Sequence, residues 1–425
     1  MSLQLNIFPV KDIIFGKSTS YNNKVVSINK KELEDLVLSD NRIKDVDFEI
    51  VHPNDKTRIT TVRDQIEPRI KISGPGCVYP GISGRSVETV GSGITNVLKG
   101  MSIFEVSDTV YYEGGDGEIE TYIDMFEPGS LYTPYGSLHN LCVSINAKDD
   151  LHIEDKNDSI HGSILKISDL IASTTINQNP DEIKISDIDI QHPDLPNVAY
   201  IISMRSPEHY SASLSAHWTA IYGVTRLTPP WLINPNELFD GAISGMASWE
   251  LVNNPVAWNL SQRHGKDINF VGCIAIRTRW SSQSEKFLTA NQVASLCETL
   301  NVSGVVVSWD SGGNDAIEVI RTVQACENKN IKTVFLTVEE TPDSGGPPLL
   351  EPLIEANAVV STGFAGAAHG RYAKIPSPNH VIGRKTLTEV DPKINKLVTV
   401  DATGPLTRLP WLDRYGFTKD SAYEY

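Results

Sequence analysis

A glycine-rich loop at residues 308–314 is a place where residue types and spacing suggest chemistry. It reads Ser-Trp-Asp-Ser-Gly-Gly-Asn and joins an apolar run to a helical pattern. Gly312 and Gly313 would let backbone N–H groups approach a ligand, and Asn314 would open a helix whose N-terminus favours an anion. Asp310, in the same loop, is a candidate catalytic carboxylate. This pattern suits a carboxylate or a phosphate ligand.

A second loop of small residues at 361–370 offers the same kind of site. It contains Gly363 and His369, which we take as candidate binding residues. The alternative for both loops is that their glycines only form tight turns between strands and helices. Neither loop has the spacing of a dinucleotide fingerprint or a P-loop, so a nucleotide is not implied.

His264 is the candidate catalytic histidine. It lies in the segment Arg-His-Gly-Lys-Asp at 263–267, just before an apolar run. The same segment is also typical of a helix end, with Gly265 as the residue that terminates the helix. We expect no metal site, because no partner at metal-ligand spacing accompanies the other histidines considered, which are His139, His217 and His369.

The composition and the sequence pattern disfavour several kinds of binding partner and cellular location. The 425 residues carry a formal net charge of −16, which disfavours nucleic acid and anionic membrane surfaces. No signal peptide and no apolar run long enough to span a membrane is visible. The five cysteines are scattered and odd in number, which argues against a disulfide framework. We therefore expect a reduced, cytoplasmic protein.

Apolar strands alternate with helical patterns in the last part of the chain. Strands are expected at 270–277, 302–309, 331–338 and 358–362. Helices are expected from Thr289, over 315–327 with Asn314 as cap, and over 347–356. Nearly continuous apolar strands alternating with helices indicate a parallel sheet covered on both faces. Ligands of such sheets gather beyond the carboxyl ends of the strands, where both glycine-rich loops lie.

The fold class that follows is α/β, with a β-rich N-terminal domain and a C-terminal, mostly parallel, doubly wound sheet. Short strand patterns separated by glycine and proline fill the first third, and a helical pattern occupies 159–172. We expect a β-rich N-terminal domain over 1–150, a mixed α/β and irregular region over 151–268, and a Rossmann-like α/β domain over 269–425.

Several short segments, each weak alone, occur in an order that is typical of one family. They are Glu67–Lys71, Gly74–Gly76, Tyr79–Gly81, Thr89–Gly93, Leu98–Gly100, Pro193–Pro196, Asp240–Gly245, Asn253–Pro255, Arg263–Asp267, Asn269–Gly272 and Asn330–Val334. Together they resemble the component B proprotein of the glycine, sarcosine and betaine reductases, a relative of the D-proline reductase proprotein. The resemblance spans nearly the whole chain.

The resemblance implies a cofactor and a partner. In that family the chain cleaves itself between an Asn and a Cys, and the new N-terminal Cys becomes a pyruvoyl group. The pyruvoyl carbonyl captures the substrate amine as an imine, and a selenolate from a partner subunit attacks the α-carbon. A hetero-oligomer with a thiol or selenol subunit is therefore the implied assembly.

This chain departs from the family at the cleavage site. Where the family has Asn-Cys, it reads Met246-Ala247, and no Asn-Cys pair occurs anywhere in the sequence. Alanine has no nucleophile, and Ser244 and Ser248 could substitute only at a shifted register. We expect an uncleaved chain without pyruvoyl or any other cofactor. Residues Ser244, Gly245, Met246, Ala247 and Ser248 remain candidates for substrate binding.

Two functions remain open. In the first, the chain binds a small-molecule substrate without an imine, and a thiol or selenol partner reductively cleaves a carbon–heteroatom bond. Arg205, His217, Trp218 and Trp231 would help to shape that site, although the tryptophans could equally be packing residues. In the second, the chain is a non-catalytic scaffold subunit of such a complex.

Overall fold

The structure is a computed structural model of the chain. It describes residues 2–109, 122–188, 192–205, 219–224, 230–245, 247–278, 282–308, 314–339, 349, 351–364, 376–391, 394, 396–405, 413–417 and 423–424. In this part of the chain no helix is long and apolar enough to cross a membrane.

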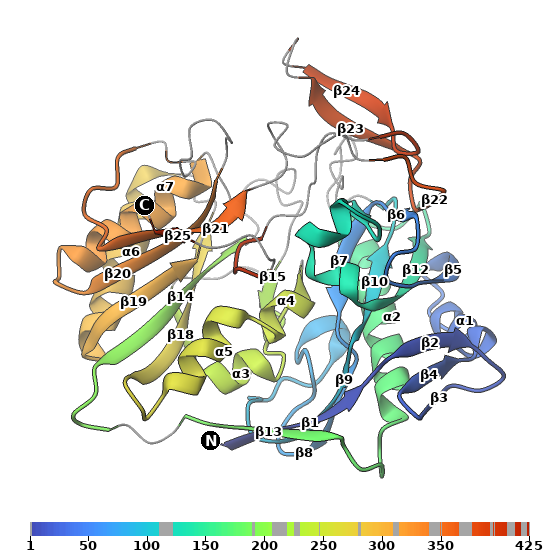
Figure 1. Cartoon of the computed structure of the whole chain (residues 1–425), viewed down its shortest axis with the longest axis horizontal. Coiled ribbons are helices and arrows are strands. Elements are labelled where there is room, and N and C mark those ends of the chain that lie inside the picture. The colour runs from blue at the N-terminus through green and yellow to red at the C-terminus, as the bar shows by residue number, and fades with distance from the viewer. Residues whose placement is uncertain are drawn as a thin grey trace.

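A seven-stranded sheet forms one side of the molecule (Figure 1), and its strand order is β16-β18-β14-β19-β20-β21-β25. Its strands are β14 (Asn197–Arg205), β16 (Trp231–Ile233), β18 (Asn269–Thr278), β19 (Val302–Ser308), β20 (Lys332–Glu339), β21 (Ala358–Phe364) and β25 (Tyr423–Glu424). The five central strands run parallel, and only the edge strands β16 and β25 are antiparallel. The expected mostly parallel sheet is confirmed.

Helices cover both faces of this sheet because its strands are apolar on both sides. Ile201 of β14 faces a core built with α6 (Gln283–Thr299) and α7 (Asn314–Glu327). The next residue, Ile202, faces the opposite core, built with α3 (Pro235–Phe239) and α5 (Pro255–Arg263). Successive strand residues point to opposite faces, so the doubly wound arrangement follows directly from the apolar runs.

The N-terminal part is built from small sheets around one helix. Its main sheets have the orders β13-β1-β9-β8 and β5-β12-β10-β7. These strands are β1 (Ser2–Pro9), β5 (Ile43–Val51), β7 (Val62–Ile66), β8 (Arg69–Ser73), β9 (Gly93–Lys99), β10 (Met101–Val106), β12 (His139–Ala147) and β13 (Glu182–Asp187). Helix α2 (Ile153–Ser173) packs its buried isoleucines into the core between them, which confirms the expected β-rich character and the helix.

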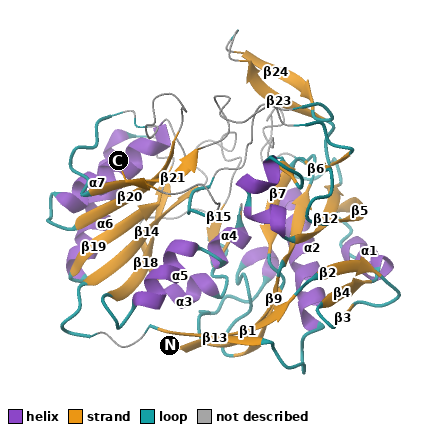
Figure 2. Ribbon diagram, in the orientation of Figure 1, coloured by secondary structure: helices purple, strands orange, loops and turns teal. Residues whose placement is uncertain are grey.

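Smaller elements complete the described structure. The strands are β2 (Asp12–Phe15), β3 (Ser20–Asn22), β4 (Val25–Ile28), β6 (Thr57–Ile59), β11 (Ile123–Asp124), β15 (Thr219–Ile221), β17 (Ile243–Gly245), β22 (His380–Ile382), β23 (Thr386–Asp391) and β24 (Lys396–Asp401). The short helices are α1 (Lys30–Leu38) and α4 (Ser248–Val252), with single turns at Ile82–Gly84, Gly129–Tyr132 and Pro134–Ser137. Figure 2 shows that strands dominate the N-terminal half, whereas helices gather around the seven-stranded sheet.

The chain passes repeatedly between the two parts. Strands β14 and β16 belong to the seven-stranded sheet although they precede residue 268, so the sheet uses residues on both sides of the boundary expected there. Late in the chain, β22 returns to pair with β6 in the N-terminal part. There the buried Arg58 binds Asp124 through two nitrogens, and its third nitrogen donates to the carbonyl groups of Ala402 and Gly404.

Two helix predictions were wrong. Helix α6 begins at Gln283 rather than Thr289, because Ser282 and Glu285 form a reciprocal capping box about two turns earlier. The described part of the expected helix at 347–356 is not helical. The predicted strands of the sheet agree with the structure to within one or two residues at their ends.

Candidate functional site

The residues on either side of Met246 have unusual backbone angles. Strand β17 ends at Gly245, and α4 begins at Ser248. Gly245 has a φ of 121°, and Ala247, at the N-cap of α4, has a φ of 71°. The left-handed region costs a residue with a side chain about 1 to 2 kcal/mol. Met246 lies outside the described residues.

Ser248 is fixed to a buried carboxylate at the end of this turn. Its hydroxyl donates to Asp64 Oδ2 at 2.6 Å, and its backbone N–H donates to Asp64 Oδ1 at 2.8 Å. The same hydroxyl accepts a hydrogen bond from the backbone N–H of Gly245 at 3.0 Å. The Ser248 Oγ therefore joins the turn to β7, the strand that carries Asp64.

Ser244 leads into a second, longer chain of hydrogen bonds. Its Oγ lies 2.9 Å from His161 Nε2, and His161 Nδ1 lies 2.7 Å from Glu105 Oε2. The other oxygen of Glu105 lies 2.8 Å from Arg63 Nε. The two serine hydroxyls are 3.3 Å apart, so the two chains meet at the turn.

Three elements bring these side chains together with β17. Strands β7 and β10 are antiparallel neighbours, and their register places Asp64 directly opposite Glu105. Cross-strand partners lie on the same face of a sheet, so both carboxylates face the same layer. Helix α2 crosses that layer and inserts His161 from its buried side. We call Arg63, Asp64, Glu105, His161, Ser244 and Ser248 the seryl cluster.

The seryl cluster is withdrawn from solvent. Each of its six side chains belongs to a residue that is no more than 2% exposed. Burying ionisable groups is costly unless they are paired and hydrogen-bonded; here Glu105 is paired with Arg63 and His161, and Asp64 is hydrogen-bonded by Ser248. Nothing in the packing of a β layer requires such a network, so its position at this turn points to function.

Burial and neighbouring charges shift the pKa values within the cluster in different directions. Burial, together with the Glu105 charge, raises the pKa of Asp64 to about 7, although His161 and Ser248 oppose the rise. Burial alone would raise the pKa of Glu105, but the charges of His161 and Arg63 hold it below its usual value. Burial alone would lower the pKa of His161, but Glu105 and Asp64 raise it above its usual value.

The arrangement is suited to moving protons. A hydroxyl, an imidazole and a carboxylate in series form the array that activates or protonates groups in many enzymes, and it is identified by geometry rather than by sequence order. Here His161 is held as a proton donor by Glu105, and Asp64 titrates near neutrality. Ser244 stands at one end of this hydrogen-bonded series, fully buried and 3.3 Å from the Ser248 hydroxyl.

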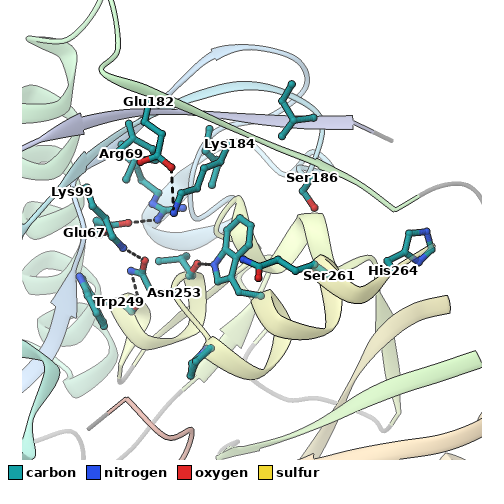
Figure 3. A pocket seen from close by; sticks show the side chains of 18 of the residues that line it. Glu67, Arg69, Lys99, Glu182, Lys184, Ser186, Trp249, Asn253, Ser261 and His264 are labelled. Carbon is teal, nitrogen blue, oxygen red and sulfur yellow. Dashed lines mark hydrogen bonds and ion pairs between the residues drawn. The ribbon is translucent and has the colours of Figure 1, made fainter. Parts of the chain in front are cut away.

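A surface groove of about 910 Å³ lies beside the turn, between β1, β9 and β13 on one side and α4 and α5 on the other. Figure 3 shows Lys99 between Glu67 and Asn253, with Trp249 beside them and His264 at the far end. The Lys99 amine donates to Glu67 at 3.2 Å and also to Asn253. Trp249 directly follows Ser248, so one wall of the groove begins where the seryl cluster ends.

Several segments that carry the family resemblance meet at this groove. Its lining includes residues from Glu67–Lys71, Leu98–Gly100, Asn253–Pro255 and Arg263–Asp267. Segments that are distant in sequence but adjacent in space indicate a shared surface rather than separate structural turns. The groove and the seryl cluster are therefore the two parts of the candidate site.

His264 lies in the groove rather than in the seryl cluster. It is the C-cap of α5, and its Nδ1 accepts a hydrogen bond from the backbone N–H of Phe270 at 3.0 Å. Gly265 follows with a φ of 73°, so the segment is the capped helix end that the sequence offered as the alternative. A catalytic role for His264 stays a prediction.

The other predicted site residues lie in different parts of the structure, and some lie outside the described residues. It brings together Ser244, Gly245, Ala247 and Ser248. Gly363 lies in β21 of the seven-stranded sheet, and its backbone N–H donates to Ser361 Oγ. Trp231 lies in β16 and stacks on Tyr222. The predictions that fall outside the described residues concern Asp310, Gly312, Gly313, His369, Met246, His217 and Trp218, while Asn314 and Arg205 are described only in their backbone.

Sequence reasoning missed the charged members of the seryl cluster. Arg63 and Asp64 lie between Val62 and Ile66 in the fully buried strand β7, and Glu105 interrupts the mostly apolar strand β10. His161 falls next to Ile160 on the apolar face of α2. Charged residues at core positions were the available signal, because such residues are rarely buried without a purpose.

Comparison with known proteins identifies the family that the sequence segments resemble. A family profile described as glycine/sarcosine/betaine reductase component B subunits matches residues 1–394. The glycine reductase complex component B subunits alpha and beta of Acetoanaerobium sticklandii are 33% identical over 402 residues, covering 91% of this chain and 89% of the relative. No solved structure matches the chain.

Two further relatives come from Peptoclostridium acidaminophilum. Its sarcosine reductase complex component B subunit alpha is 30% identical over 381 residues, covering 85% of this chain and 86% of the relative. Its betaine reductase complex component B subunit alpha is 32% identical over 383 residues, covering 85% and 84%. The similarity therefore extends over nearly the full length of proteins named for three different substrates.

Proposed function

Because the chain belongs to the family of glycine/sarcosine/betaine reductase component B subunits, we propose that it is the substrate-binding subunit of such a reductase complex and works uncleaved, without pyruvoyl. The proposed partner is a subunit that carries a reactive thiol or selenol. The proposed reaction is the reductive cleavage of a carbon–heteroatom bond.

The observation that supports a catalytic role is the seryl cluster. It places a proton-donating imidazole, His161, behind the hydroxyl of Ser244 at 2.9 Å, in a layer withdrawn from water. A subunit that served only as a scaffold would have no need of this costly network. Low dielectric strengthens every electrostatic interaction with a bound substrate.

The residues at the turn do not suit a pyruvoyl group. Ala247 ends in a methyl group, so it cannot attack the preceding carbonyl. Ser248 carries the next hydroxyl, but that hydroxyl is turned to Asp64 and to the backbone of Gly245. We therefore assign no step to a pyruvoyl carbonyl.

The seryl cluster would act on the leaving group. In the proposed step, the partner's thiolate or selenolate forms a bond to the substrate carbon while the carbon–heteroatom bond breaks. The heteroatom leaves with the bonding electron pair and takes a proton from the Ser244 hydroxyl, which His161 reprotonates. General acid catalysis of this kind typically accelerates a reaction by about 10²- to 10⁴-fold.

The test compares variants of the chain in the purified complex with its partner. Ser244→Ala and His161→Asn should leave the complex assembled but reduce turnover of glycine or sarcosine by about 10²-fold or more. Ser173→Ala is the matched control, because Ser173 lies at the end of the same helix as His161 and its hydroxyl donates to Leu170 O of that helix. Full turnover by the partner alone, or by both variants, would exclude the catalytic role and leave the scaffold function.

The uncleaved state has a separate test. Intact-mass spectrometry of the purified chain should give one species near 46.8 kDa. Two fragments that together make up that mass, or an N-terminus that reacts with a hydrazide, would contradict the proposal. A cut before Ser248 would identify Ser248 as the nucleophile instead.

A further inference from the structure

Three metal-binding side chains that are far apart in the sequence meet at one end of the β5-β12-β10-β7 sheet. Asp12 opens β2, His52 directly follows β5, and His139 opens β12. Strands β5 and β12 are antiparallel, with Asn140 opposite Val51, so their register places His139 beside His52. The three elements lie together at the edge of the N-terminal part (Figure 1).

The ligand atoms converge on one point. His52 Nδ1 lies 2.9 Å from His139 Nδ1 and 3.6 Å from Asp12 Oδ1, and all three atoms lie within 4.8 Å of one another. In a tetrahedral zinc site with bonds of about 2.0 to 2.1 Å, neighbouring ligand atoms are about 3.3 Å apart. The two measured separations bracket that value. For these two pairs, shifts of a few tenths of an ångström would give the separation of a zinc site, and the third pair, Asp12 and His139, lies within 4.8 Å.

The surrounding backbone holds the ligands in place. The His139 ring also hydrogen-bonds to the backbone of Lys11, which helps to fix its orientation. Asp12 Oδ1 accepts a hydrogen bond from the backbone N–H of Ile13 at 2.9 Å. Asp55 accepts from the backbone N–H of His52 at 2.8 Å. All three ligands are thus fixed by the ends of strands rather than by free loops.

We propose that Asp12, His52 and His139 form a binding site for a divalent transition-metal ion, with Zn²⁺ as the best match. Two imidazole nitrogens and one carboxylate are donors that suit zinc and its neighbours, whereas Mg²⁺ and Ca²⁺ require oxygen ligands. The side chains of His52 and Asp12 are 38% and 46% exposed, so an ion can enter from solvent. Three protein ligands leave a fourth position for water. The proposal is independent of the seryl cluster.

The expectation of no metal site was based on spacing along the chain. His139 has no ligand within a few residues, and its two neighbours come from positions 12 and 52. Only the pairing of β5 with β12 and the packing of β2 beside β12 bring them together. A site of this kind leaves no motif in the sequence.

The test is a titration of the full-length protein with Zn²⁺ after treatment with a chelator. Calorimetry should show one equivalent bound by the wild type. His52→Gln and Asp12→Asn should each weaken binding by about 10- to 100-fold. Circular dichroism would establish that each variant is folded. Binding of Co²⁺ should produce visible absorption bands of a nitrogen–oxygen site without a thiolate charge-transfer band.

Two matched variants exclude the competing binding sites. His380→Gln removes a more exposed histidine, which bonds to Glu49 and to none of the three proposed ligands, and should leave the affinity unchanged. Cys77→Ser removes a partly exposed thiol and should also leave it unchanged. Wild-type affinity in folded His52→Gln, or loss of binding in Cys77→Ser, would overturn the proposal. Stoichiometric binding that depends on His52 and Asp12 would establish it.

Discussion

The buried carboxylate of Asp64 makes the stability of the protein depend on pH in a way that one substitution should remove. Burial raises the pKa of Asp64 to about 7 in the folded chain, whereas an aspartate in the unfolded chain titrates near 3.9. Between these values the folded state retains a proton that the unfolded state has lost. Stability is therefore fully present below the unfolded pKa and is lost as pH rises through the folded pKa.

Asp64→Asn should abolish this loss. The difference between the folded and unfolded pKa values means that Asp64 contributes about 2 to 3 kcal/mol less to the free energy of unfolding at pH 8 than at pH 5. Asparagine can still accept from the Ser248 N–H, and the Ser248 hydroxyl can turn to the Gly245 carbonyl, which lies 3.0 Å away. As the pH rises from 5 to 8, the free energy of unfolding of Asp64→Asn should therefore increase relative to that of the wild type by about 2 to 3 kcal/mol.

Urea unfolding of both proteins at the two pH values measures the effect as a difference of differences. This comparison cancels the titration of all other groups that the substitution leaves untouched. Asp149→Asn is the control, because Lys44 keeps the pKa of the exposed Asp149 below its usual value, so this aspartate is charged throughout the range. An equal stability difference at both pH values would refute the assignment of a neutral-range pKa to Asp64.

Three further outcomes are expected. Ala247→Gly should raise the free energy of unfolding by about 1 kcal/mol, because glycine adopts the left-handed φ of 71° without strain, and thermal melting would detect it. Arg58→Ala should lower the free energy of unfolding by about 3 to 5 kcal/mol, because it leaves the buried Asp124 without its ion pair, and denaturant unfolding against Arg85→Ala, a more exposed pair, would measure it. Glu105→Gln should lower the pKa of His161, because burial then acts against the charged ring with less opposition, and a histidine NMR titration that shows no fall would contradict the role of Glu105.

The sequence was sufficient to predict the parallel strands of the sheet because most of their residues are apolar, whereas the antiparallel edge strands β16 and β25 were not predicted. In Val302–Ser308, for example, Val305 and Val307 are buried in the core with α6 and α7, whereas Val306 packs against the core on the opposite face. The start of α6 was misplaced because Thr289 and Gln292 imitate a capping box inside a helix that Ser282 and Glu285 already cap. The local sequence alone does not show which of the two capping boxes begins the helix.

The candidate site was predictable only in part. The turn at 244–248 was found through its departure from a family pattern, which marks a place but not its surroundings. His161 and Glu105 come from elements that are far from the turn in sequence, and their meeting depends on the register of β7 with β10 and on the position of α2. Both depend on tertiary structure, which local sequence patterns do not reveal. The one available sign in the sequence is a charged residue at a position where a buried element should be apolar.

The return of β22 to β6 has a consequence for how the chain is made. During synthesis one edge of β6 stays open, and Arg58 lacks two of its acceptors, until Ala402 and Gly404 have left the ribosome. The N-terminal half therefore lacks part of its native contacts for nearly the whole of translation. During that time the open edge of β6 can pair with the wrong strand or be bound by chaperones. Separate expression of the two halves should give an aggregation-prone first half that regains order when the last segment is supplied in trans.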